Sequence, residues 1–184
     1  MIINPLRCKV ANFDEFRDSF GHDSLMALNF ENKIVIDVPN HPTRTELGER
    51  LMTITDEINI NKFDFSEGKD GHYLTATNQV YLKYASATMT VEEVIRNKEG
   101  VVDYLLVRLT KVKTKPRKIK ILTWISDAVP AVLNIFGNLL ESSQPLPGVA
   151  ISDQVNEESW KKCQVLVEKS LLAKLERYVG FEFG

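Results

Sequence analysis

The sequence predicts an α/β sandwich, in which helices cover both faces of a central mixed β-sheet. Three observations predict this fold class. The 184 residues are 43% hydrophobic and 26% charged, the composition of an ordinary globular domain. The segments 101–112 and 119–125 are apolar on both faces at the two-residue period of a strand, which is typical of strands inside a covered sheet. Stretches with helical periodicity precede and follow them, so covering helices are expected.

Residues 1–42 are predicted to form an N-terminal extension of one short helix and one β-hairpin. Three phenylalanines recur at helical spacing among charged residues within 13–20, which indicates a short amphipathic helix. Two β-favouring runs, 25–30 and 33–38, flank a short polar turn and predict a hairpin. The proline-containing segment 39–42 then ends the extension, because proline lacks a backbone donor and disfavours helix at the preceding residue.

The main domain is predicted to cover residues 43–184 and to begin with a helix. Thr43 and Glu46 have the spacing of a capping box, in which each side chain bonds the other residue's backbone. The apolar residues that follow recur every three or four positions, as on one helix face: Leu47, Leu51, Ile54 and Ile58. This helix is expected to cover one face of the central sheet.

A second hairpin and a second helix are predicted before the first inner strand. The segment 72–89 is rich in Thr, Tyr and Val, so it predicts two strands joined by a turn near Asn78. Thr90 and Glu93 repeat the capping-box spacing, and Gly100 is a residue type that commonly ends helices. A short helix is therefore expected between them.

The last third of the chain is predicted to be mainly helical. Apolar residues surround much of the segment 128–140, which predicts either a deeply buried helix or one that faces a partner. Asn156 can cap a final helix, since two glutamates follow in its first turn. The apolar stripe of that helix is Trp160, Cys163, Val167, Leu171, Leu175 and Tyr178.

The spacing of reactive side chains does not match known catalytic or metal sites. His22, His41 and His72 lie far apart, and Cys8 and Cys163 do not form a metal-binding pair. We therefore expect no catalytic residue, no metal ligand and no cofactor. An enzyme on an α/β scaffold is the least supported hypothesis, and a deep pocket with His41 or His72 beside carboxylates would favour it.

A cytoplasmic location is expected from the sequence. No apolar run approaches the roughly 20 residues needed to span a bilayer, and the first residues lack the apolar core of a secretory signal. The sequence has no N-x-Ser/Thr acceptor site and only two cysteines, which fits a reducing compartment. A formal net charge of −2 excludes a wholly basic nucleic-acid coat protein.

A basic cluster between the two predicted inner strands is the most specific surface feature. Its members are Lys111, Lys113, Lys115, Arg117, Lys118 and Lys120. Such charges repel one another unless they are solvated or meet an anionic partner. One interpretation is a solvated hairpin loop; the other is a contact to an acidic protein, anionic lipid or nucleic acid. No aromatic residue interleaves the cluster, which argues against single-stranded nucleic acid, although phosphate contact by the lysines stays open. We therefore expect an acidic protein or anionic lipid surface and not a nucleic acid as the partner.

The segment 117–130 contains a Lys-Ile pair, an apolar strand, Thr-Trp, and then Asp and Pro before a predicted helix. In these features it resembles the actin-depolymerising factor/cofilin homology family, and residues 106–110 resemble its coactosin branch. The resemblance covers residues 90–178, and in order of elements also 43–89. It implies an ADF/cofilin-like fold and a non-catalytic, cytoskeleton-associated module that binds an actin filament or an actin-related protein.

The resemblance also implies which residues contact the partner. Positions that match the family's filament contacts are Lys113, Lys115, Arg117, Lys118, Lys174 and Arg177. Where the family carries basic residues that meet monomeric actin, this chain has Val132, Leu133 and Asn134, which puts monomer binding in doubt. The alternative is a self-associating or viral matrix-like assembly protein that touches anionic membrane, motivated by the extension and by the apolar segment 128–140.

Overall fold

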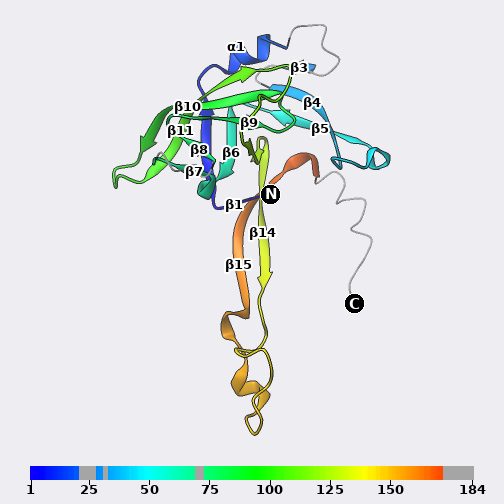
Figure 1. The fold of residues 1–184 in the computed structure, drawn as a ribbon, viewed down its shortest axis with the longest axis vertical. Helices are drawn as coiled ribbons and strands as arrows, with labels where there is room; N and C mark the ends of the chain where they lie inside the picture. The colour runs from blue at the N-terminus through cyan, green and yellow to red at the C-terminus, as the bar shows by residue number, and fades with distance from the viewer. Residues whose placement is uncertain (21–27, 31–32, 69–72, 172–184) are drawn as a thin grey trace.

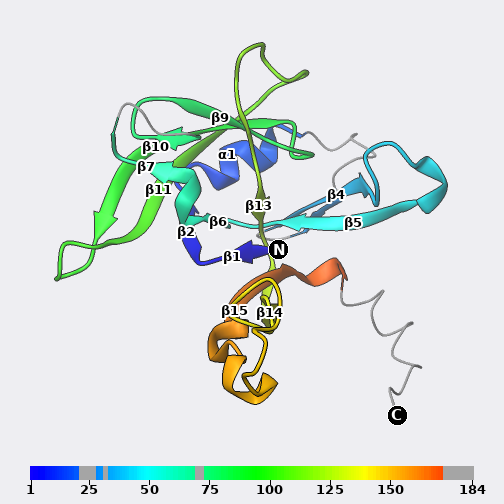
Figure 2. The ribbon, with the colours of Figure 1, turned by 60° about the horizontal axis from the view of Figure 1, so that its bottom comes forward.

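The computed structural model describes residues 1–20, 28–30, 33–68 and 73–171, and strands dominate them (Figure 1). The predicted α/β sandwich is therefore wrong. Within the described ranges the only α-helix is α1 (Phe13–Asp18), so helices do not cover the sheets. A nearly closed β-barrel forms the body of the molecule, and a long two-stranded ribbon projects from it (Figures 1 and 2).

The barrel is one sheet of seven strands. Their spatial order is β12 (Ile121–Leu122), β9 (Gln79–Leu82), β10 (Ala87–Arg96), β11 (Val102–Lys111), β2 (Pro5–Val10), β6 (Glu57–Asn61) and β13 (Trp124–Ile125). The two edge strands, β12 and β13, are separated in the chain only by Thr123. One bent segment thus pairs with β9 at one edge and with β6 at the other, which nearly closes the barrel.

Alternating apolar side chains fill the barrel. They are buried on three adjacent inner strands at Leu6, Cys8, Val10, Ile58, Ile60, Leu105, Val107 and Leu109. Helix α1 packs against β11, since the side chain of Asn12 exchanges two hydrogen bonds of 2.9 Å with the backbone of Leu109. Phe13, Phe16 and Phe20, whose spacing predicted a helix, are all buried. The helix predicted within 13–20 is therefore confirmed.

The predicted first hairpin is confirmed in the described residues. Strands β3 (Leu28–Phe30) and β4 (Lys33–Pro39) pair antiparallel, whereas positions 25–27 and the turn at 31–32 lie outside the described residues. A third strand, β5 (Glu49–Ile54), joins them on the far side of β4. The predicted boundary at residue 42 falls between two strands that pair with each other, and β2 from the first segment lies inside the barrel.

The helix predicted from Thr43 is wrong. The chain forms only the 3-10 turn η1 (Thr45–Leu47) before it continues as β5 and β6. Ile54 and Ile58 fit a helical period and a strand period equally well. The structure buries Met52, Ile54, Ile58 and Ile60 and leaves Leu47 and Leu51 about half exposed, which is the two-residue alternation of strands.

The helix predicted from Thr90 is also wrong, because residues 87–96 form β10 and pair with both β9 and β11. Its β-branched residues, such as Val91 and Val94, fit a paired strand better than a helix. The turn predicted near Asn78 lies instead between β9 and β10, where Tyr84 and Ser86 have positive φ angles of 71° and 48°. Before it, β7 (Phe65–Ser66) and β8 (Leu74–Thr75) pair in parallel.

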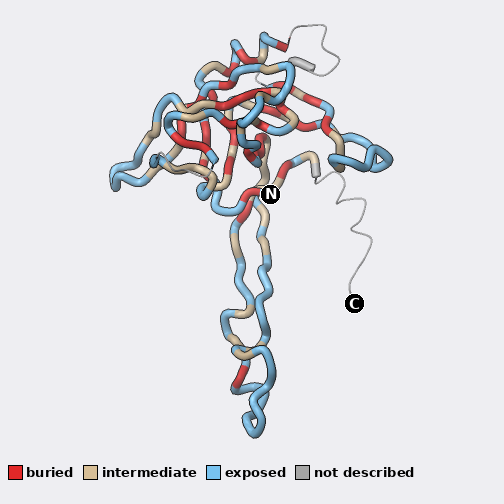
Figure 3. The backbone as a smooth tube through the Cα atoms, in the orientation of Figure 1, coloured by how far each residue is buried: buried red, intermediate tan, exposed pale blue. Residues whose placement is uncertain are grey.

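The ribbon replaces both helices predicted in the last third of the chain. Strands β14 (Ala128–Phe136) and β15 (Trp160–Glu168) pair antiparallel, and β1 (Ile2–Ile3) joins the foot of β15. The apolar residues of 128–140 would surround a helix on all sides, but in a strand they would make both faces apolar. The pattern therefore fits a two-stranded ribbon as well as a helix. Most of the ribbon is exposed, whereas buried positions concentrate in the barrel (Figure 3).

The tip and foot of the ribbon contain short 3-10 turns. These are η3 (Ile151–Gln154), η4 (Glu157–Ser159) and η5 (Lys169–Leu171). Asn156 was predicted to cap a final helix; it caps the 3-10 turn η4 instead, where its side chain accepts a 3.0 Å hydrogen bond from the Glu158 backbone. The second half of the predicted final helix, 172–184, lies outside the described residues. Among the residues that are described, no helix has the length and hydrophobicity required to cross a bilayer.

Ser126 ties the start of the ribbon to the barrel. Its side chain is buried, donates a 2.6 Å hydrogen bond to the Glu57 carbonyl and accepts one of 2.9 Å from the Thr55 backbone. Asp127 follows with a positive φ of 46° and turns the chain into β14. The ribbon therefore leaves the barrel at a hydrogen-bonded corner.

We expect Ser126→Ala to lower the free energy of unfolding by about 1–3 kcal/mol, because it leaves the partly buried Thr55 amide without its partner. Urea denaturation followed by tryptophan fluorescence measures this change. Ser143→Ala is the matched control, since Ser143 is exposed on the ribbon and is expected to change stability by less than about 0.5 kcal/mol. Equal stability of the two variants would contradict the anchoring role of Ser126.

Candidate nucleic-acid interface

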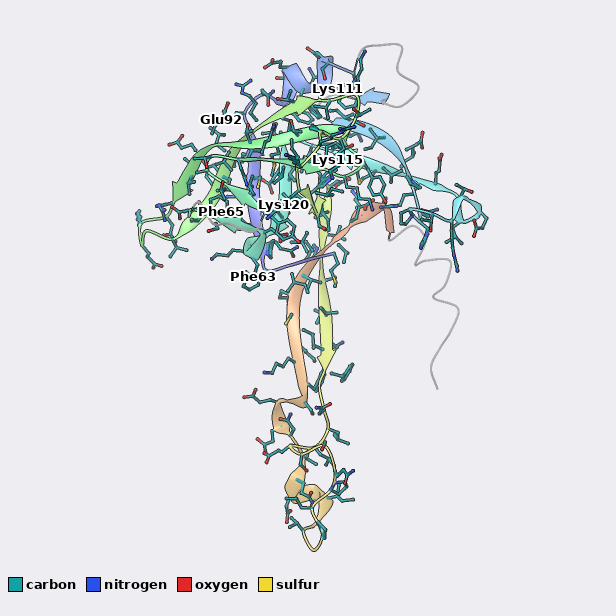
Figure 4. All side chains as sticks on the ribbon, viewed as in Figure 1. Phe63, Phe65, Glu92, Lys111, Lys115 and Lys120 are labelled. Carbon is teal, nitrogen blue, oxygen red and sulfur yellow. The ribbon has the colours of Figure 1, made fainter. Side chains whose placement is uncertain are left out.

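The basic cluster lies on an exposed crossover and not on a hairpin. After β11 the chain passes over β10 and β9 and enters β12, which pairs in parallel with the far side of β9. The predicted pair of neighbouring inner strands is therefore wrong: β11 is an inner strand, but 119–125 supplies both edge strands of the barrel. The predicted exposure of the connection is confirmed (Figure 4). We call residues 112–120 the basic crossover.

Lys111 differs from the other basic residues because it stabilises the fold. Its ammonium group donates a 3.0 Å hydrogen bond to the Ser19 carbonyl and lies 4.1 Å from the centre of the Phe20 ring. These contacts tie the end of β11 to the residues after α1. Lys111 is therefore held on the helix side of the barrel.

Four basic residues of the crossover remain available to a partner. They are Lys113, Lys115, Arg117 and Lys118, all exposed and none ion-paired with any residue that the structure describes. Lys118 also has a positive φ of 67°, an uncommon conformation for a side-chain-bearing residue that recurs at binding sites. The proposed contacts Lys174 and Arg177 lie outside the described residues.

An aromatic residue from a distant part of the sequence lies beside the crossover. The Lys120 ammonium is 5.5 Å from the centre of the Tyr73 ring, and this ring is 41% exposed. Two adjoining hollows, of about 480 and 510 Å³, share both residues. Their lining residues, which we call the Tyr73 pocket, are Tyr73, Thr77, Asn78, Gln79, Thr90, Lys115, Lys118, Ile119, Lys120 and Ile121.

Hydrogen bonds within 73–78 hold Tyr73 in place. The Asn78 amide donates to the Tyr73 carbonyl and accepts from the Thr75 backbone, both at 2.8 Å. The Thr75 hydroxyl accepts from the backbone amides of Thr77 and Asn78 at 3.3 and 3.2 Å. Asn78 is therefore a positioning residue whose amide is already used. The backbone that carries the Tyr73 ring is therefore fixed before a ligand binds.

The Tyr73 pocket combines the two features that bind unpaired nucleotides. An exposed ring stacks on bases, and flexible cations contact phosphates. Gln79 is exposed at the pocket wall, and its side-chain amide forms no hydrogen bond to a described residue, so it can bond a base edge. The sequence argument against single-stranded nucleic acid is thereby overturned, because the missing aromatic residue comes from the segment before β8.

A further hollow, beside α1, does not share this chemistry. Its volume is about 670 Å³, and Asp14, Glu15 and Asp56 line it with Arg108. Arg108 is already paired, with Glu92 at 2.5 Å and with Glu15 at 3.2 Å. An acidic hollow whose arginine is neutralised repels phosphate, so it is a poorer candidate for a nucleic-acid interface than the Tyr73 pocket.

The described residues form no catalytic arrangement that we recognise. His41 sits in an exposed turn and accepts from the backbone amides of Thr43 and Arg44 at 3.2 and 3.1 Å, while His22 and His72 lie outside the described residues. No cluster of His, Cys, Asp and Glu suited to a metal occurs in the described part of the chain. Burial, with the nearby charge of Glu57, raises the pKa of the Cys8 thiol to about 12, which keeps it protonated and unreactive.

Comparison with known proteins finds one matching family and several similar proteins. Residues 1–110 match the family described as tRNA synthetases class I (E and Q), anti-codon binding domain. The glutamine–tRNA ligase of Haemophilus influenzae KW20 is 31% identical over 165 residues, which cover 84% of this chain and 29% of the ligase. The glutamine–tRNA ligase of Pasteurella multocida is 32% identical over 84% of this chain and 29% of the ligase. That of Pectobacterium atrosepticum is 26% identical over 98% of this chain and 32% of the ligase. The chain thus spans about a third of the length of these relatives.

Proposed function

Because the chain belongs to the anticodon-binding domain family of the class I tRNA synthetases for Glu and Gln, we propose that it binds the anticodon region of a tRNA. The resemblance to the actin-depolymerising factor/cofilin family is wrong, and the actin filament, actin-related and cytoskeletal predictions fall with it. The segment 117–130 that carried it forms the end of the basic crossover, β12, β13 and the start of β14, not a strand followed by a helix. The prediction against a nucleic-acid partner is wrong as well.

The observation that carries this proposal is the contact between Lys120 and Tyr73 at the edge of the barrel. It places an exposed ring beside the basic crossover, within a pocket large enough for a nucleobase. Bases that leave the helical stack in an RNA loop can stack on this ring, and Lys115 and Lys118 lie where they can meet the adjoining phosphates. The net charge of the chain is slightly negative, but the positive charges of the basic crossover are concentrated in one segment, which can attract RNA locally.

We propose recognition and not catalysis for this chain. The matched family is a binding domain, and the relatives that carry the name of a ligase are about three times as long. A cytoplasmic location fits this role. The assembly-protein alternative was motivated by the N-terminal extension and by an apolar helix at 128–140. Residues 128–136 form a strand of the ribbon instead, and β2 of the extension is part of the barrel.

We expect Tyr73→Ala to weaken binding of an anticodon stem–loop RNA by roughly 5- to 150-fold, which corresponds to the loss of one stacked base. Tyr73→Phe keeps the ring and is expected to bind within a few-fold of the parent chain. Fluorescence anisotropy with a labelled stem–loop of bacterial glutamine tRNA measures both affinities. Wild-type affinity in the alanine variant would remove the Tyr73 pocket from the interface, and no binding by the parent chain would overturn the proposed function.

A further inference from the structure

Phe63 is the most exposed large apolar side chain in the described part of the chain, with 81% of its surface in contact with solvent. It lies in the 3-10 turn η2 (Lys62–Asp64) between β6 and β7, at the end of the barrel from which the ribbon projects (Figure 4). A phenylalanine left in water forgoes the roughly 1.5–3 kcal/mol that burial provides. The position therefore contributes little to the core.

Hydrogen bonds fix the turn that carries Phe63. The Asn61 side chain accepts from the Ile3 backbone at 3.0 Å and donates to the Asp64 carboxylate at 3.1 Å. The Lys62 backbone donates to the Asn4 carbonyl at 3.0 Å. The backbone on both sides of Phe63 is thus anchored, while its ring is exposed.

Phe63 and Tyr73 lie in the chain segments that precede two paired strands. Phe65 of β7 lies opposite Leu74 of β8 in a parallel pair, so Tyr73 is aligned with Asp64, and Phe63 precedes that position by one residue. Spacings of about 5 Å between strands and 3.3 Å between residues place the two backbones within roughly 10 Å. Lys62 is exposed beside Phe63 and forms no ion pair with a described residue.

We propose that Phe63 is a second stacking platform, which holds an unpaired nucleotide next to the one in the Tyr73 pocket. This inference rests on the proposed function, since it extends the same RNA path by one base. The ring of Phe63 would stack on the base, and Lys62 would meet its phosphate. Stacking on a phenylalanine is insensitive to base identity because every base has a π-face. Phe63 therefore adds affinity and does not discriminate among bases.

The test compares Phe63→Ala, Phe63→Trp and Tyr73→Ala in binding to the glutamine tRNA anticodon stem–loop. We expect Phe63→Ala to weaken binding about tenfold and Phe63→Trp to preserve or strengthen it. Phe136→Ala is the matched control, because Phe136 is 76% exposed but lies on the ribbon, and its affinity should equal that of the parent chain. Thermal melting should show unchanged stability for Phe63→Ala.

Stem–loops with a single abasic loop nucleotide locate the stacked base. When the base that stacks on a ring is missing from the RNA, removing that ring should cost no further affinity. We expect the loop position identified in this way for Phe63→Ala to be adjacent to the one identified for Tyr73→Ala. Parent-level affinity in Phe63→Ala, with a loss in Tyr73→Ala, overturns this inference and leaves the proposed function standing. A change in self-association without a change in RNA affinity identifies a protein contact and also overturns it. Failure of the parent chain to bind RNA overturns the proposed function itself.

Discussion

Replacing Lys115, Arg117 and Lys118 together by glutamate is expected to weaken anticodon stem–loop binding by at least about a hundredfold at moderate salt. The three side chains are exposed and form no ion pair with a described residue, so the change removes contacts to RNA and not contacts within the protein. Their phosphate contacts release counterions, so the slope of log affinity against log salt should fall in magnitude by about two. Fluorescence anisotropy across a salt series measures both quantities.

The control for this prediction makes the same change in net charge elsewhere. Arg44, Lys98 and Lys162 are exposed and lie in the turn after β4, in the turn between β10 and β11 and on the ribbon. Their replacement by glutamate is expected to weaken binding only several-fold through the long-range field, which salt screens. If both triple variants lose affinity equally, the basic crossover has no local role, and the lysines reflect net charge alone.

The second large effect is expected at the foot of the ribbon, from Arg50→Met. The Arg50 guanidinium bonds both oxygens of Glu168, at 2.9 and 3.1 Å, and donates to the Pro39 carbonyl at 3.1 Å. The two side chains are only 14% and 11% exposed. Removing Arg50 leaves the largely buried Glu168 carboxylate without its main partner, which lowers the free energy of unfolding by about 3–5 kcal/mol. Urea denaturation measures this loss.

A double variant separates the cost of the unpaired charge from the value of the pair. Arg50→Met with Glu168→Met removes both charges, and hydrophobic replacements of a buried pair are often neutral. We expect the double variant to be more stable than Arg50→Met alone. A double variant that is as unstable as the single one would show that Arg50 acts through packing and through Pro39 instead.

The same pair predicts how stability depends on pH. Burial alone would raise the pKa of Glu168, but hydrogen bonds from Arg50 and Ser170, with the positive charges of Arg50 and the N-terminus, outweigh it and hold the pKa below the usual 4.5. A carboxylate with a lowered folded-state pKa stabilises the fold above its unfolded value. The contribution of Glu168 is therefore present above about pH 4.5 and is lost as the pH falls below it. Arg50→Met should lose this acid-side dependence in urea denaturation at several pH values.

Local sequence patterns were sufficient to predict those elements whose structure is decided by their own side chains. The phenylalanine spacing in α1, the alternating strands β3 and β4 and the capping of η4 by Asn156 all follow from neighbouring residues. The exposure of the basic crossover follows as well, since like charges at that density are costly to bury. In each case the interaction that decides the structure spans only a few residues.

Elements whose apolar pattern fits the period of a helix and that of a strand could not be assigned from neighbouring residues. Residues 49–60 and 128–136 carry apolar residues at helical spacing, yet they pair as strands with partners far away in the chain. Capping-box residues such as Thr90 and Glu93 contribute about 1 kcal/mol, which is less than a full strand gains from two paired neighbours and a buried face. Tertiary pairing therefore outweighed the local signals.

By itself, the sequence determined a globular chain with an amphipathic α1, a first hairpin and a solvated run of cations between β11 and β12. Only the tertiary structure decided that the sheet nearly closes through the bend at Thr123 and that Tyr73 lies against Lys120. The physical reason is that charge and periodicity are properties of neighbouring residues. The juxtaposition of ring and cation, in contrast, depends on strand register between β9, β10 and β12, which the packed barrel alone sets.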